Sequence, residues 1–64
     1  MWKLRYYRYG ALEEYEDETK EDVLSFGVWQ SEDGQLSMFE LVNPNGEVVM
    51  SAEELKNYWF AYKF

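Results

Sequence analysis

The absence of cysteine and histidine decides how this chain of 64 residues can hold itself together. Neither a disulfide nor the usual Cys/His zinc site is open to it, and many domains of this size depend on such cross-links. Its stability must therefore come from apolar packing. Three Trp, six Tyr and four Phe supply the area, since one buried aromatic side chain removes about 150–250 Å² from water. We expect one folded domain over residues 1–64.

The residue types also limit the chemistry that the chain can perform. Without His or Cys it can build neither a Ser-His-Asp triad nor a Cys nucleophile. Its glycines, at positions 10, 27, 34 and 46, match neither a dinucleotide-binding fingerprint nor a P-loop. The calcium-loop pattern of alternating Asp and Asn before a Gly is absent as well. We predict a protein that is not an enzyme and has no catalytic residue, metal site or cofactor.

Residues 2–9 alternate in the manner of a β-strand, with Trp2, Leu4 and Tyr6 on one face. The other face carries Lys3, Arg5, Tyr7 and Tyr9. Basic side chains beside stackable rings are typical of single-stranded nucleic-acid binders, so this second face is an alternative nucleic-acid face. The net charge of −7 opposes that use. The competing interpretation is that the cations of this strand pair with acids later in the chain.

Acidic side chains crowd the segment that follows. Residues 13–22 contain seven carboxylates, and residues 13–33 contain nine acids against a single Lys. Such a cluster can steer a basic protein toward its binding site. The candidate partner-binding acids are Glu13, Glu14, Glu16, Asp17 and Glu18. The alternatives are a solvated surface that maintains solubility and a set of internal ion pairs across a hairpin.

Two helices and two further strands follow from local patterns. Thr19 is the expected N-cap of a helix that ends before Gly34, and Ser51 with Glu54 matches the capping box of a second helix. Residues 35–42 and 47–50 read as strands joined by a tight turn over 43–46, in which Gly46 takes a positive φ, as does Gly34. Residues 11–18 are ambiguous between a short strand and an acidic loop. Gly27 lets the first helix lie close to a sheet.

These elements predict a small α+β domain in the order β-(β)-α-β-β-α, with a three- or four-stranded sheet and both helices packed on one face. If the strand at 2–9 pairs directly with the strand at 35–42, the two must be parallel, with a right-handed crossover. The predicted core residues are Trp2, Leu4, Tyr6, Val23, Leu24, Val28, Leu36, Met38, Val48, Leu55 and Trp59.

Aromatic residues are concentrated at the C-terminus, where they make up five of the last seven residues. On a helix, Tyr58, Trp59 and Tyr62 form one stripe, while Phe60 and Phe64 turn partly away from it. Phe60 and Phe64 are therefore candidate aromatic anchors for a partner or a second copy. The alternative is that this tail completes the core.

Together these features favour a small, acidic, aromatic-rich protein-binding module whose partner has a basic surface. In size and charge the chain resembles the small accessory proteins of phages and mobile elements, which implies an inhibitor that occupies a host protein's surface. The alternatives are a small nucleic-acid-binding domain and a structural homo-oligomer such as a homodimer. We see no signal-peptide stretch and no membrane span, so we expect a soluble, cytoplasmic protein without a membrane partner.

Overall fold

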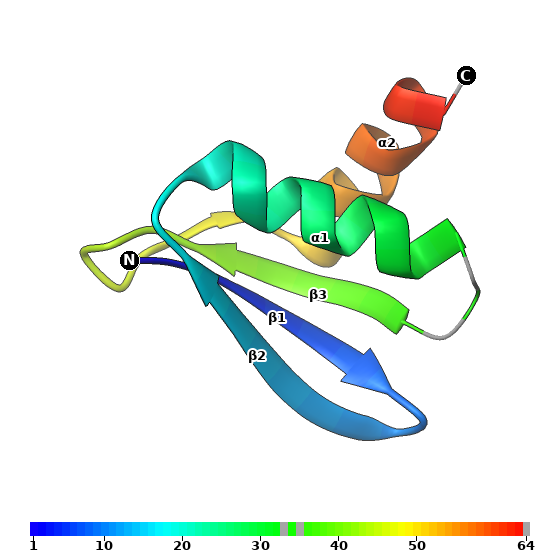
Figure 1. Ribbon diagram of the computed structural model, residues 1–64, viewed down its shortest axis with the longest axis horizontal. Helices are drawn as coiled ribbons and strands as arrows, with labels where there is room; N and C mark the ends of the chain where they lie inside the picture. The colour runs from blue at the N-terminus through cyan, green and yellow to red at the C-terminus, as the bar shows by residue number, and fades with distance from the viewer. Residues whose placement is uncertain (33, 35, 64) are drawn as a thin grey trace.

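Within residues 1–32, 34 and 36–63, which the computed structural model describes, the chain forms one four-stranded sheet and two helices (Figure 1). The elements are β1 (Trp2–Arg8), β2 (Ala11–Asp17), α1 (Lys20–Glu32), β3 (Leu36–Val42), β4 (Val48–Met50) and α2 (Ala52–Lys63). The strand order is β2-β1-β3-β4, and each neighbouring pair is antiparallel. Helix α1 packs on β1, β2 and β3, and α2 on β3 and β4. This confirms the predicted α+β class and element order.

The ambiguous acidic segment forms a full strand. β2 pairs with β1 residue by residue, from Arg8 opposite Ala11 to Trp2 opposite Asp17. Tyr9 and Gly10, with φ values of 53° and 81°, make the two-residue turn between the strands, which is the geometry of a type I′ hairpin. Because β2 reverses the chain, β3 runs antiparallel to β1, and the parallel pairing that we expected is wrong.

Both helix starts are confirmed. The Thr19 Oγ1 atom accepts a hydrogen bond from the Asp22 amide at 3.1 Å. Ser51 and Glu54 form the reciprocal capping box: the Glu54 amide donates to Ser51 Oγ at 3.2 Å, and the Ser51 amide donates to Glu54 Oε1 at 3.1 Å. Gly34 and Gly46 have the predicted positive φ values, 72° and 85°.

The core lies between the sheet and the helices, and most of its members were predicted. The predicted core residues that are buried are Leu4, Tyr6, Val23, Leu24, Val28, Leu36 and Leu55. Trp2, Met38 and Trp59 are half-buried. The prediction of Val48 as a core residue is wrong, since the structure leaves it 52% exposed.

Two β-bulges explain why Leu41 is buried and Val48 is exposed. In β3, Glu40 lies opposite Arg5 and Met38 opposite Tyr6, so Phe39 is an extra residue. This bulge turns Leu41 into the core, where it is fully buried, and turns Glu40 away from it. A second shift makes Val49 the extra residue of β4, which turns Met50 toward the core and Val48 away.

Gly27 lets α1 lie close to the sheet, as predicted. A Cβ atom at this position would lie 2.6 Å from Met38 Sδ and 2.8 Å from Leu4 Cδ2. Both distances are shorter than carbon side chains tolerate, so any other residue must push the helix or its neighbours aside.

Candidate functional site

The sheet face that the helices leave uncovered carries a network of ion pairs. Arg5 of β1 lies between two acids from neighbouring strands, with Nε 3.0 Å from Glu14 Oε2 and Nη1 2.6 Å from Glu40 Oε1. The Nζ atom of Lys3 lies 3.6 Å from carboxylate oxygens of both Glu14 and Glu16. The internal pairing that competed with the nucleic-acid interpretation is thus present for Lys3 and Arg5.

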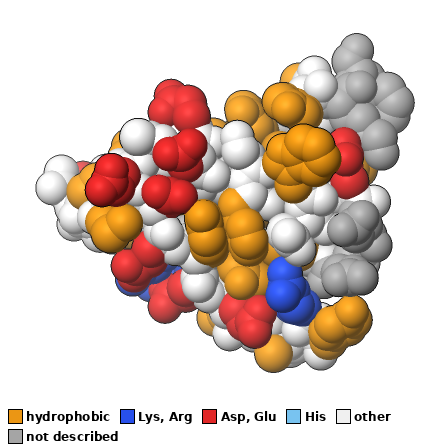
Figure 2. Space-filling model, viewed as in Figure 1, with side chains coloured by type: hydrophobic (Ala, Val, Ile, Leu, Met, Phe, Trp, Pro, Cys, Tyr) orange, Lys and Arg blue, Asp and Glu red, His pale blue; other side chains and the backbone are white. Residues whose placement is uncertain are grey.

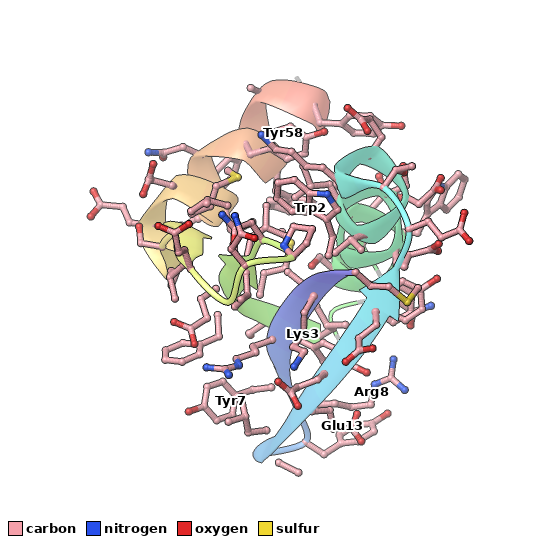
Figure 3. All side chains as sticks on the ribbon, turned by 90° about the vertical axis from the view of Figure 1, so that its left-hand side faces the viewer. Trp2, Lys3, Tyr7, Arg8, Glu13 and Tyr58 are labelled. Atoms are coloured by element: carbon pink, nitrogen blue, oxygen red, sulfur yellow. The ribbon has the colours of Figure 1, made fainter. Side chains whose placement is uncertain are left out.

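Arg8 does not join this network. Its Nη2 atom donates to Gln30 Oε1 of α1 at 3.0 Å, and its guanidinium lies 5.7 Å from the centre of the Tyr6 ring. In Figure 3, Tyr7 points away from α1, whereas Arg8 and Glu13 lie on the α1 side of the hairpin. Arg8 therefore fastens the hairpin to α1 on the opposite face from Arg5.

The alternative nucleic-acid face is only partly assembled. Lys3, Arg5 and Tyr7 share the uncovered face, but Tyr9 lies in the turn and not on the strand, which corrects the predicted set. The hydrogen bond from Arg5 holds the pKa of Glu14 below its usual range, with the charge of Lys3 acting in the same direction. Hydrogen bonds to Glu40 and Glu14 raise the pKa of Arg5. The cations of this face are engaged by carboxylates.

The five candidate acids do not form one patch, because β2 divides them between its two faces. Glu14 and Glu16 lie on the uncovered face in the ion pairs with Lys3 and Arg5. Glu13 and Asp17 alternate with them and lie on the α1 side, where Figure 2 shows acidic side chains in red around apolar ones. Glu18 follows the end of the strand and is exposed.

Local contacts hold the α1 side of β2 in place. The Tyr15 ring stacks on Phe26 of α1, with ring centres 3.9 Å apart and planes 10° from parallel. The Tyr15 hydroxyl donates to Asp17 Oδ2 at 2.9 Å, and this bond raises the pKa of Tyr15. The Glu18 amide donates to Asp17 Oδ1 at 2.7 Å. Tyr15, which no sequence pattern singled out, thus fixes β2 against α1.

β2 is also an edge of the sheet, with β1 as its single neighbour among the described strands. Its seven residues pair with β1 without a register shift. The other edge, β4, has three residues and contains the bulge at Val49. The two edges therefore differ in length and regularity, and β2 is the long, even one.

Exposed apolar side chains lie at the hairpin end of the uncovered face. Tyr7 and Phe39 meet edge to face with ring centres 5.5 Å apart, and both are more than a third exposed. Leu12, opposite Tyr7 on β2, is 52% exposed. Phe39 is absent from the predicted sites, although the alternation of β3 with Leu36 and Met38 on the core side already places it on this face.

The predicted C-terminal aromatic anchors have different outcomes. Phe60 is 42% exposed; its ring meets Trp59 edge to face at 5.0 Å, and Lys56 Nζ lies 6.0 Å from its centre. Phe64 lies outside the described residues. A groove of about 320 Å³ lies between α1, β3 and α2, with Met38, Lys56 and Trp59 among its lining residues.

In the part of the chain that the structure describes, no group of three or more acids is arranged to hold a metal ion. No helix in the same residues is both long and apolar enough to cross a membrane. No protein-family model, curated protein or solved structure matches this chain.

Proposed function

We propose that the protein is a small, non-enzymatic protein-binding module that docks on a partner with a basic surface. The observation that carries this proposal is the position of β2. It is a seven-residue sheet edge with Glu13, Glu14, Glu16 and Asp17 spread over both of its faces. An exposed edge is a common place for a second chain to bind, and the acids define the charge of that chain.

Charge supports the same proposal through the approach of the partner. The net charge of −7 favours the approach of a basic protein at long range. Three of the candidate acids, Glu13, Glu18 and Asp17, belong to none of the ion pairs that the described residues form. Of these, Glu13 and Glu18 are exposed, and exposed carboxylates raise the association rate with a basic partner and lose that effect as salt screens them.

The nucleic-acid alternative has less support. It needs Lys3 and Arg5 to meet phosphates, yet each of them already lies against two carboxylates. Phosphate contacts would have to displace these pairs against the repulsion of the remaining acids. We therefore favour a protein partner, and occupation of its surface as the mode of action, as in an inhibitor.

The test is affinity capture from the native host, identification of the captured protein, and measurement of its binding kinetics over a range of salt. Reversing Glu14 or Glu16 would break ion pairs to Lys3 or Arg5, so the steering variant should be Glu18→Lys. Its matched control is Glu53→Lys, which makes the same charge change at the start of the other helix.

We expect Glu18→Lys to slow association and weaken its salt dependence, while the control variant has a smaller effect. Dissociation should change less in both, because exposed charges act mainly on the encounter. Association rates that are equal in both variants and the parent would contradict steering by this segment. Failure of any basic protein to bind would contradict the proposed function itself.

A further inference from the structure

We propose that β2 binds its partner by strand addition. An extended segment of the partner lies beside β2 and continues the sheet, with Lys or Arg at alternate positions opposite Glu14 and Glu16. This inference rests on the proposed function and names the site, the backbone conformation and the residue pattern of the partner. Its support comes from the sheet edge, the hairpin register and the charge order across the strands.

The two edges of the sheet are protected to different degrees. Proteins guard an edge by shortening it, bulging it, covering it or placing Pro or charges on it. β4 is short, is bulged at Val49 and follows a turn that contains Pro44. β2 has seven residues in unbroken register, and charge is the one of these devices that it carries. It is therefore the edge at which a further strand fits.

The hairpin register shows which backbone groups face outward. Arg8 and Ala11 flank the two-residue turn and form its closing, hydrogen-bonded pair. Hydrogen-bonded and non-hydrogen-bonded pairs alternate along an antiparallel ladder. Leu12, Glu14 and Glu16 therefore direct their N–H and C=O groups away from β1. A strand placed alongside β2 would satisfy these groups without disturbing the hairpin.

The order of charges across the sheet favours a basic residue on the added strand. One row of side chains runs Glu40, Arg5, Glu14 from β3 to β2, and the next runs Lys3, Glu16 from β1 to β2. Signs alternate along both rows, and both end on an acid at the edge. The next strand position in each row thus favours a cation. The carboxylates of Glu14 and Glu16 are 44% and 52% exposed, which leaves room for a further donor.

A third row adds an apolar position to this pattern. It runs Ser37, Tyr7, Leu12 from β3 to β2 at the hairpin end, with Phe39 packed against Tyr7 from the bulge, and Leu12 occupies the edge. Every neighbouring pair in the sheet is antiparallel. An added antiparallel strand meets Glu16 first, then Glu14, then Leu12. Its expected pattern is a cation, any residue, a cation, any residue and an apolar residue.

A second copy of the chain fits this edge poorly. Two copies of β2 side by side would bring the acids of one strand against the same acids of the other. Like charges placed opposite each other destabilise a strand pair. The acids therefore disfavour self-association at this edge and at the same time favour a basic strand.

The experiment uses synthetic peptides, so that the decisive change lies outside the protein and cannot unfold it. The probe is a short peptide that alternates Lys with Thr and ends in Val, titrated against the full chain at low salt. The control peptide has the same sequence but carries N-methyl groups on the backbone nitrogens that would face β2. It keeps every charge and loses the hydrogen-bond donors.

We expect the unmodified peptide to bind and the N-methylated peptide to bind roughly tenfold more weakly or worse. Glu16→Gln, which removes the charge without placing a second cation beside Lys3, should weaken binding of the unmodified peptide, and Glu53→Gln should not. Equal binding of the two peptides would overturn strand addition, because charge alone would then explain the affinity. Binding of the captured partner without any peptide binding would also overturn it, while leaving the proposed function intact. A dimer held through β2 would overturn it as well.

Discussion

The substitution Gly27→Ala tests how closely α1 lies on the sheet, and two effects of opposite sign compete at this position. In a helix interior, Ala is more favourable than Gly by about 1 kcal/mol. The new methyl group would, however, lie 2.6 Å from Met38 Sδ and 2.8 Å from Leu4 Cδ2. Met38 is half-buried and can shift its chain end, but Leu4 is fully buried among core residues.

Overpacking of a well-filled core typically costs about 1–3 kcal/mol, which exceeds the gain in helix propensity. We therefore expect a net loss in the free energy of unfolding of about 1–2 kcal/mol for Gly27→Ala. Urea denaturation followed by tryptophan fluorescence measures it. In a Met38→Ala background one of the two close contacts is gone, so the same substitution should cost less.

A Gly27→Ala variant that is more stable than the parent would refute this reasoning, because helix propensity would then be acting without a clash. An identical cost in the Met38→Ala background would show that Met38 takes no part in the contact. The first result would mean that α1 can move away from the sheet, and the second that the close contact is with Leu4 alone.

Three further substitutions test other parts of the structure. Leu55→Ala should remove about 2–5 kcal/mol from a domain whose total stability is about 3–5 kcal/mol, since Leu55 is fully buried; a folded circular dichroism spectrum with the parent's melting curve would contradict its placement. Tyr9→Asn should raise the melting temperature, because Tyr9 has a φ of 53° and is 83% exposed, and Asn tolerates the left-handed region better; a lower melting temperature would count against strain in the turn. The hydrogen bond from Arg5 lowers the pKa of Glu14. The stabilisation from this bond is complete above the unfolded-state pKa of Glu14 and is lost as the pH falls through its folded-state pKa. The parent should therefore lose more stability than Glu14→Gln between neutral and acid pH, and an equal fall in the urea midpoints of the two proteins would contradict the ion pair.

Local features of the fold could be predicted because their causes are local. The caps at Thr19 and Ser51 satisfy amides within three residues, and Gly34 and Gly46 take positive φ values that few other residues tolerate. The role of Gly27 could be predicted because glycine is unfavourable in a helix interior, which indicates that another element packs closely there.

Features that depend on distant pairing could not be predicted. The bulge at Phe39 is set by how β3 fits β1, and nothing in the local pattern of apolar residues marks it. The strand character of the acidic segment depends on Lys3 and Arg5 facing Glu14 and Glu16, a pairing across the hairpin. Like-charge density alone indicated a loop as readily as a strand.

The candidate site also depends on pairing between distant parts of the chain. The acids were identified from composition, but their division between two faces follows from the alternation of a strand whose existence was ambiguous. The edge position of β2 follows from the strand order β2-β1-β3-β4, which no sequence motif encodes. Glu40 lies on the uncovered face, opposite Arg5, because of the equally non-local bulge in β3.

Amide hydrogen exchange of β2, measured residue by residue by NMR, tests the docking edge most directly. In the free protein, the amides of Leu12, Glu14 and Glu16 should exchange faster than those of Glu13 and Tyr15, which face β1. Addition of the alternating Lys peptide should slow exchange at Leu12, Glu14 and Glu16 specifically. Exchange that stays fast at these three amides, while other parts of the surface become protected, would contradict a docking strand at β2.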